Sequence, residues 1–437
     1  TLGEMIPSHQ LPLVGLLLFS LIPRQQCEIC EISRENYTAL NPLINTMINS
    51  KYSTGIQAIN VLLSLRLGGI LNQNQEQQLM RPIIHTVQNN ESSLTSGQLA
   101  LSILALGACK SPDEMFQNYP VLVKQLENKF QEEIKNMEEH DDNPLTNYYQ
   151  LSLDVLALCL FSGNYSISIV ARKFNPENKN YYFHRQFSVD TGAMAVLALT
   201  CVKRDKTNSQ NVIYKRDLEI IGGHIESLIR KILSQKKEDG LIGNIYSTGE
   251  AMQALFVSSH YYKKSQWDCQ KTRNKVLEEI PEGVFRMPTA AAQILPALLG
   301  KTYLDVNKDS SCVYKSGAFN LTTQEPTSGP PAVSRPQIQV NYSVVINTTH
   351  SITVSVANGS VFLDVMEKAE KENATLFSFT AEESLWGPYI TTVQGIKANS
   401  NERTYWELLS NGEPLSQGAG SYVVHAGENL EVRWSKY

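Results

Sequence analysis

Residues 186–201, QFSVDTGAMAVLALTC, decide the fold, because they form one of six related segments along the chain. The polar start can accept hydrogen bonds from the unpaired N–H groups of a first helical turn. The run of Ala, Leu and Met that follows is apolar nearly all round, which is typical of a buried helix. Asp190 stands in the polar start, where its carboxylate has lone pairs enough to cap the helix and to hold a ligand.

Five further segments repeat this pattern of a polar start and an apolar run. They are STGIQAINVLLSL from residue 53, TSGQLALSILAL from 95, NYYQLSLDVLAL from 147, YSTGEAMQALF from 246 and PTAAAQILPALL from 288. Corresponding residues recur every 41 to 57 positions, a period typical of helical hairpins. The six markers of the repeat are Thr54, Ser96, Tyr148, Thr191, Thr248 and Thr289.

Six helical hairpins can form an open solenoid or a closed barrel. The apolar helices need cover on both faces, which favours a closed barrel with six inner and six outer helices. All six polar starts would then lie at one concave mouth, where a ligand is expected to bind. We therefore predict a six-over-six α/α barrel over residues 28–312, with Asp190 as one member of a ring at its mouth.

The composition changes after the barrel. Residues 313–336 contain four prolines and few large apolar residues, as a linker does. Residues 337–437 alternate polar and apolar positions around one helical segment at 361–372, which predicts a small β-rich α+β domain. The expected strands are 337–347, 350–360, 375–380, 389–396, 422–426 and 430–434.

Two domains joined by a linker can close on a ligand between them. Trp386, Tyr389 and Trp406 of the second domain suit a flat, mostly apolar ligand face. Packing in the core of the domain is the alternative for these rings, and it is the preferred interpretation for Trp434.

The N-terminal segment, residues 1–27, is expected to be a secretory signal peptide. Its apolar run from Leu11 to Pro23 is too short to span a bilayer and fits the central part of such a peptide. A buried N-terminal helix is the alternative. Cys27 would leave with the signal peptide, and the six remaining cysteines predict three disulfides, for which fifteen pairings are possible.

Eight Asn-X-Ser/Thr sequons are typical of a secreted, extracellular glycoprotein, and their glycans require exposed attachment points. A net charge of −5 without basic runs argues against binding to nucleic acid or to an anionic membrane. The sequons are at Asn36, Asn90, Asn164, Asn320, Asn341, Asn347, Asn358 and Asn373.

Motifs for catalysis are missing from the sequence. There is no His-Glu-x-x-His zinc motif and no Gly-x-Ser-x-Gly elbow, and GKT at 300–302 has Leu295 where a phosphate loop requires Gly. Barrels of this class also house glycosidases and terpenoid cyclases, which need paired acids at the mouth. Asp190 is the lone acid among the expected mouth positions, and Asp154, the nearest candidate partner, lies a turn inside its helix. Binding of a neutral, amide-rich ligand is therefore favoured over an enzyme acting on glycans or isoprenoids.

Long motifs carry a resemblance to a known family. They are LTNYYQLSLDVLALCLF from 145, FSVDTGAMAVLALTCVK from 187, GLIGNIYSTGEAMQALF from 240, AAAQILPALLGKTYLDVNKDSSC from 290 and LSQGAGSYVVHAGENLEVRWSKY from 415. From Cys30 to Tyr437 the chain resembles the secreted cobalamin carriers, a family of haptocorrin, intrinsic factor and transcobalamin, and within it the haptocorrin branch. The resemblance implies that cobalamin lies between a six-over-six barrel and a β-rich domain. It also implies the disulfides Cys30–Cys269, Cys109–Cys312 and Cys159–Cys201.

The family motifs, carried over position by position, imply a set of ligand contacts. The corrin ring of cobalamin bears several amide side chains, which carboxylates and amides can match. Backbone groups are expected to matter as much as side chains in the last two segments of the set. The implied contacts are Gln98, Thr146, Asn147, Tyr148, Tyr149, Gln150, Asp190, Thr191, Asn244, Gln293, Trp386, Tyr389, Gly395, Ile396, Trp406, Glu407 and Leu408.

Two departures from the family pattern are informative. In transcobalamin a His just before the SVDT-type motif can ligate cobalt, whereas here Phe187 precedes Ser188 and His184 lies three residues earlier. We therefore expect no protein ligand on cobalt. Haptocorrin can carry an Arg in the loop before Trp386, whereas this chain has Ser384 and Leu385.

The resemblance thus implies a carrier that takes cobalamin and its analogues as cargo, without catalysis. It is expected to be a monomer, with a cell-surface receptor left open as a further partner. An intrinsic-factor-like or transcobalamin-like carrier with receptor-mediated uptake is the alternative within the family.

Overall fold

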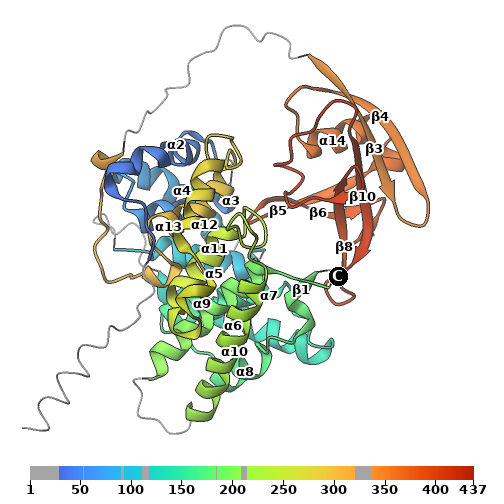
Figure 1. Cartoon of the computed structure of the whole chain (residues 1–437). Helices are drawn as coiled ribbons and strands as arrows, with labels where there is room; N and C mark the ends of the chain where they lie inside the picture. Colours follow the sequence, from blue (N-terminus) through green and yellow to red (C-terminus); the bar gives the residue numbers. More distant parts are fainter. Residues whose placement is uncertain are drawn as a thin grey trace, which may run out of the picture.

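The structure is a computed structural model of the chain that describes residues 29–52, 54–89, 93–110, 118–183, 185–207, 214–319 and 336–437. A helical domain lies beside a smaller β-rich domain (Figure 1). The predicted signal peptide, Cys27 and His184 lie outside the described residues. Among the described residues, no helix is both long and apolar enough to cross a membrane.

The inner helices of the barrel are the six segments of the sequence repeat. Each contacts the next, and the last contacts the first, so the ring is closed as predicted. Each helix begins within two residues of its marker position. The inner helices are α3 (Gly55–Gly68), α5 (Ser96–Leu106), α7 (Tyr148–Leu160), α9 (Val189–Thr207), α11 (Thr248–Val257) and α13 (Pro288–Leu298).

The outer helices alternate with the inner ones along the chain and are one-sided. In α10 the buried residues follow helical spacing on one face, from Ile221 through Ile225 and Leu228 to Ile232, so this face packs on the inner ring. The outer helices are α2 (Asn41–Asn49), α4 (Gln73–Asn89), α6 (Tyr119–Glu139), α8 (Ile167–Lys173), α10 (Lys215–Ser234) and α12 (Cys269–Glu279). The other helical segments of this domain are 3₁₀ helices: η1 (Arg34–Leu40), η2 (Lys179–Tyr181), η4 (Ser259–Tyr261), η5 (Lys264–Gln266), η6 (Tyr303–Asp305) and η7 (Ser316–Ala318).

Side-chain caps fix the start of several inner helices at the mouth. The Asn147 side chain accepts from the Gln150 N–H at 2.9 Å at the start of α7. At the start of α9 the Ser188 hydroxyl accepts from the Thr191 N–H at 3.3 Å. Ser188 thus fills the capping position, while Asp190 lies in the first turn of the helix, where its carboxyl group hydrogen-bonds a backbone N–H.

Three disulfides staple the helical domain, with the pairing that the resemblance implies. They join Cys30 to Cys269, Cys109 to Cys312 and Cys159 to Cys201. The last one ties α7 to α9, two neighbouring inner helices.

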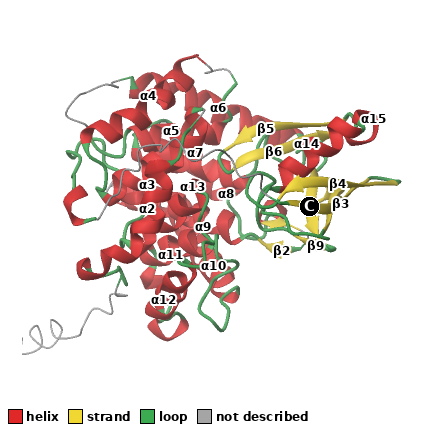
Figure 2. Ribbon diagram, turned by 90° about the horizontal axis from the view of Figure 1, so that it is seen from above, coloured by secondary structure: helices red, strands yellow, loops and turns green. Residues whose placement is uncertain are grey.

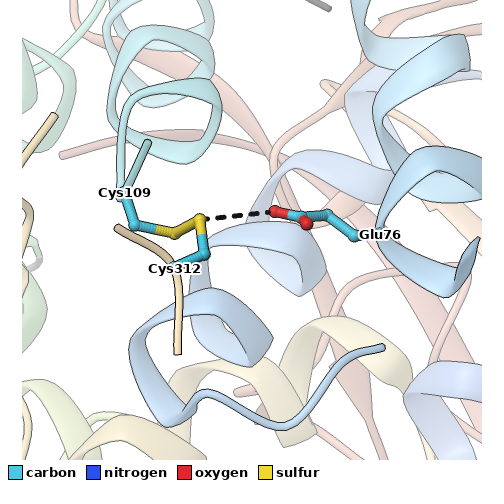
Figure 3. Close-up of side chains that lie close together, drawn as sticks. All are labelled: Glu76, Cys109 and Cys312. Carbon is cyan, nitrogen blue, oxygen red and sulfur yellow. Dashed lines mark hydrogen bonds between the residues drawn. A yellow bond between two sulfur atoms is a disulfide. The ribbon is translucent and has the colours of Figure 1, made fainter. Parts of the chain in front are cut away.

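Glu76 of α4 lies beside the second disulfide, with its Oε1 3.7 Å from the Cys312 Sγ (Figure 3). Carboxylate and sulfur atoms at such distances could hold a metal ion only if both cysteines were thiolates. In this structure the two sulfurs are bonded to each other, and the Glu76 carboxylate is paired with Arg66 at 2.5 Å. The cluster is therefore part of the scaffold.

The β-rich domain contains two sheets and a covering helix. In the larger sheet the strand order is β4-β3-β10-β8-β9, with β3 and β10 parallel and the other pairs antiparallel. The helix α14 (Phe362–Glu372) packs on β3 and β4. The strands are β3 (Gln337–Val345), β4 (Thr349–Ala357), β8 (Thr404–Ser410), β9 (Glu413–Pro414) and β10 (Asn429–Lys436), and in the smaller sheet β5 (Phe379–Ser384), β6 (Gly387–Val393) and β7 (Ile396–Lys397).

Three expectations about this domain need correction. Residues 375–377 belong to the short helix α15 (Ala374–Phe377), whose start the Asn373 side chain caps. Residues 422–426 form no strand beyond one bridge, because the Tyr422 carbonyl and the Val424 N–H pair with the segment that leads into α14. The strand β8 was not among the expected strands, although it is central to the larger sheet.

The described sequons lie on the surface, as expected. Asn90 and Asn320 lie outside the described residues. The exposed sequon residues are Asn36, Asn164, Asn341, Asn347, Asn358 and Asn373.

The first part of the predicted linker packs on the barrel, since the Phe319 ring stacks on Tyr37 with centroids 4.9 Å apart.

Candidate ligand-binding site between the domains

The two domains meet at the mouth of the barrel, where the β5–β6 hairpin reaches into the helical domain (Figure 2). The Asn60 amide of α3 donates to the Leu385 carbonyl at 3.0 Å. Leu385, at the hairpin tip, is buried in the hydrophobic core of the barrel. The hairpin therefore anchors the small domain over one side of the mouth.

Two neighbouring hollows lie along this domain interface. The inner cavity, of about 330 Å³, is bounded by the starts of α7, α9 and α13 and by residues of the small domain. The outer cleft, of about 1440 Å³, lies between the hairpin of β1 (Tyr182–Phe183) and β2 (Gln186–Phe187) and the strands β6 and β8. Asp190, Asn244 and Gln417 line both hollows, so the two are continuous.

Most of the residues implied by the family motifs gather around these hollows. Trp386 is 36 % exposed and contacts Tyr149 edge-on, with ring centroids 5.6 Å apart. The implied residues that line the inner cavity are Thr146, Asn147, Tyr148, Tyr149, Asp190, Thr191, Asn244, Gln293 and Trp386. Those that line the outer cleft, besides Asp190 and Asn244, are Tyr389, Trp406, Glu407 and Leu408.

Four implied residues line neither hollow: Gln98, Gln150, Gly395 and Ile396. The Gln98 amide donates to the Glu383 carbonyl at 3.1 Å and so holds the small domain. Trp406 lies at the edge of the outer cleft, but its ring packs on Trp434 in the domain core, as the alternative interpretation expected.

Asp190 is the one acid among the described residues that line the inner cavity, but a second acid lies close behind it. Glu250 of α11 is fully buried behind the inner cavity, where its Oε1 accepts from the Tyr149 hydroxyl at 2.6 Å. The Gln293 amide nitrogen lies 3.4 Å from the same oxygen. Burial raises the pKa of Glu250 to about 8, with a further contribution from the nearby Asp190. Burial also raises the pKa of Asp190 to about 6. The signal in the sequence that could have found Glu250 is a lone Glu on an otherwise apolar inner helix.

Asp154, the predicted partner of Asp190, lies away from the cavity. It is fully buried in α7, and burial raises its pKa well above the usual range, with the Glu133 carboxylate adding to the effect. Glu133 of α6 in turn holds two mouth segments, because it accepts from the Ser96 hydroxyl at 2.8 Å and from the Thr146 hydroxyl at 2.7 Å. Glu133 thus positions the segment that leads into α7.

A second set of contacts closes the far side of the mouth. The Asn136 amide donates to the Asn401 side-chain oxygen at 2.7 Å, and the Asn143 amide donates to the Asn401 carbonyl at 2.9 Å. Arg403 donates to the Asn180 side-chain oxygen at 2.5 Å. We call these five residues the interdomain latch. Together with the β5–β6 hairpin, the latch holds the small domain at two points of the barrel.

Comparison with known proteins shows the family to which the chain belongs. A family model described as eukaryotic cobalamin-binding protein matches residues 12–332, which is most of the chain. A domain of unknown function, DUF4430, matches residues 359–436. The chain belongs to the eukaryotic cobalamin-binding protein family.

Relatives across the whole length identify the branch of this family. Human Transcobalamin-1 is 63 % identical over 433 residues, which cover 99 % of this chain and 100 % of the relative. Transcobalamin-1 of Sus scrofa is 51 % identical over 92 % of this chain and 94 % of its own. Human cobalamin binding intrinsic factor is 34 % identical over 92 % of this chain and 93 % of its own. The chain is thus similar to the haptocorrin branch more than to intrinsic factor, as the motifs implied.

A solved structure shares the fold. The crystal structure of haptocorrin in complex with Cbi superposes with a TM-score of 0.85 at 60 % identity and covers 94 % of this chain and 100 % of its own. The barrel and the β-rich domain of this family are therefore present here.

Phe187, which directly precedes the cap of α9, is held by aromatic packing. The Phe187 ring packs on Tyr182 with centroids 5.8 Å apart and lies against Gly192, where an added Cβ would approach it to 2.4 Å. No His is among the described residues that line either hollow. Phe187 thus forms an apolar part of the wall of the outer cleft.

Proposed function

We propose that this chain is a secreted glycoprotein that binds and transports cobalamin and related corrinoids between its two domains, without catalysis. The observation that carries the proposal is the pair of continuous hollows, polar at the helix starts and capped by Trp386, in a chain that belongs to the cobalamin-binding family. The outer cleft alone exceeds the roughly 300–1,000 Å³ of an ordinary small-ligand pocket, which suits a ligand of corrinoid size.

The lining suits a ligand rich in amides. Asp190 and Gln293 can accept from amide N–H groups, and Asn244 can both donate and accept. An amide buried without a partner costs about 1–3 kcal/mol, so such a lining favours ligands whose amides match it. We propose the residues of both hollows as ligand contacts, together with backbone groups of Glu407 and Leu408. Gln98, Gln150, Gly395 and Ile396 stay proposals from the family motifs.

An enzyme of the same barrel class is the second candidate, because Asp190 and Glu250 form a pair of carboxyl groups on neighbouring inner helices. Acid–base hydrolysis by two carboxyl groups needs both to reach the substrate or a water beside it. Glu250 has no exposed surface and lies behind Tyr149, so it cannot reach a reacting group. Transport is favoured for this reason.

Secretion and the domain division also stay part of the proposal. The three disulfides and the exposed sequons support an oxidising, extracellular environment. We propose a signal peptide over 1–27, a barrel domain over 28–312, a linker over 313–336 and a closing domain over 337–437. The carrier would act as a monomer and place no protein ligand on cobalt.

Titration of the purified protein with cyanocobalamin tests the function. We expect one corrinoid per chain to remain bound after gel filtration, which gives the protein a red colour and a corrinoid absorbance spectrum. Protein that elutes colourless after incubation with excess cyanocobalamin would contradict the proposal.

A further inference from the structure

Glu250 is a buried acid with no compensating charge beside it among the described residues. Its Oε1 accepts from the Tyr149 hydroxyl, while its Oε2 has no hydrogen-bond partner among the described residues. The titratable groups that face it are Tyr149 from α7, Asp190 from α9 and Tyr303 from η6, and none of them is cationic. An ionised carboxylate in this setting would be strongly destabilised, so the acid keeps its proton.

The partners of Glu250 are residues that line the inner cavity. Tyr149 supports the ring of Trp386, and Gln293 extends from α13 into the cavity wall. Because the Gln293 amide nitrogen donates to Glu250 and Gln293 lines the inner cavity, its amide oxygen is the acceptor that this side chain can offer to a ligand. An amide held in this orientation presents its oxygen as an acceptor for the ligand, while Glu250 engages one of its two N–H donors.

We propose that Glu250 is a positioning residue for corrinoid binding, which as a neutral acid orients Gln293 and Tyr149 toward the amide N–H groups and the face of the ligand. The inference rests on the proposed function. Under this inference Glu250 helps to retain the corrinoid although it does not contact it. Gln293 recognises a ligand carboxamide through its oxygen, and a carboxylate at the same place on the ligand is disfavoured.

Protonation of Glu250 makes the inference testable by pH. Burial raises its pKa to about 8, so the neutral acid predominates at pH 7 and is lost as the pH rises through about 8. The ionised form adds a second negative charge beside Asp190 in a buried place, which disfavours the packed arrangement of Glu250, Gln293 and Tyr149. Ligand dissociation is therefore slow below pH 8 and accelerates above it.

The experiment measures how fast labelled cyanocobalamin dissociates from the full chain between pH 6 and pH 10. Excess unlabelled cyanocobalamin is added to prevent rebinding. The variants are Glu250→Leu, which removes the acceptor, and Glu250→Gln, which keeps an acceptor but cannot titrate. Asp154→Asn is the matched control, because it changes an equally buried acid of the barrel away from both hollows.

We expect Glu250→Leu to dissociate about tenfold faster at pH 7, as the loss of a buried hydrogen bond of about 1.4 kcal/mol implies. Glu250→Gln is expected to stay within about twofold of the wild type at pH 7 and to lose the acceleration above pH 8. Asp154→Asn should keep both the rate and the pH profile of the wild type. If Glu250→Leu fails to fold, the difference between the pH profiles of the wild type and Glu250→Gln decides, because a merely structural role would not produce it.

Identical pH profiles for the wild type and Glu250→Gln would overturn the inference, as would an unchanged dissociation rate in folded Glu250→Leu. Both results leave the proposed function intact, since the wild type still binds. A wild-type chain that binds no cyanocobalamin would contradict the proposed function and this inference together.

Discussion

Glu250 and Glu76 are two buried acids in the same barrel, and their surroundings are opposite. Glu76 of α4 pairs with Arg66 at 2.5 Å and accepts from the Tyr314 hydroxyl at 2.6 Å, so both of its oxygens have partners. Glu250 has no cation beside it and one oxygen without a partner among the described residues. The first acid holds helices together, whereas the second is maintained at a cost where the ligand is proposed to bind. Glu250 thus differs from Glu76 in two respects: it has no cation beside it among the described residues, and its partners Tyr149 and Gln293 line the inner cavity.

The largest effect should follow from breaking the compensated pair. Arg66→Met leaves the Glu76 charge buried without its cation, which costs about 3–5 kcal/mol of the free energy of unfolding. Urea unfolding followed by circular dichroism measures the loss. The double variant Arg66→Met, Glu76→Met is the control and should recover much of it, because two apolar side chains replace the pair. A single variant within about 1 kcal/mol of the wild type would show that the pair is not buried as described.

The uncompensated acid should show in the pH dependence of stability. The pKa of Glu250 is raised from 4.5 to about 8, so between these values the folded protein holds a proton that the unfolded chain has released. Stability of the ligand-free protein therefore falls by up to a few kcal/mol as the pH rises across this window. Glu250→Gln should flatten that slope, as thermal unfolding at stepped pH would report. Equal slopes in the two proteins would mean that Glu250 is not uncharged in the fold.

Asp190 separates a binding role from a capping role. Asp190→Ala is expected to weaken cyanocobalamin binding by about 1–3 kcal/mol while the free energy of unfolding changes little, because Ser188 caps the helix. Ser188→Ala is the matched variant and should lower stability by about 1 kcal/mol. Calorimetric titration and urea unfolding measure the two effects. Lost stability with unchanged binding in Asp190→Ala would make it a cap after all.

The interdomain latch should give the smallest effect. Asn401→Ala removes the side-chain acceptor for Asn136 and is expected to speed corrinoid dissociation a few-fold, as the loss of one half-buried hydrogen bond of about 0.5–1.5 kcal/mol implies. Gln339→Ala, on the exposed face of β3, is the control and should change nothing. Dissociation slowed by Asn401→Ala would contradict a latch that holds the closed form.

Local sequence signals predicted the barrel well and the site only in part. The six polar starts and apolar runs identified the inner helices because burial on both faces leaves a direct mark on composition. The acid close to Asp190 was missed, because Glu250 comes near Asp190 and behind the inner cavity only through the relative rotation of α9, α11 and α13, which no local pattern encodes. Residues 422–426 were misassigned for a similar reason, since their hydrogen bonds go to a segment about 60 residues earlier.

The domain contacts show the same limit. Gln98 and Trp406 are both expected at the ligand, and both also make structural contacts: Gln98 holds the β5–β6 hairpin, and the Trp406 ring, which lines the outer cleft, packs on Trp434. Their residue types suit either role, so only the packing of one domain on the other decides between them.

A crystal structure of the chain with cyanocobalamin bound tests the central claim most directly. The corrinoid is predicted to lie between the helix starts of the barrel and Trp386, with a ligand amide within hydrogen-bonding distance of the Gln293 oxygen and Glu250 behind it, out of contact. A corrinoid bound on another face, or one that contacts Glu250 itself while Gln293 turns away, would contradict the account.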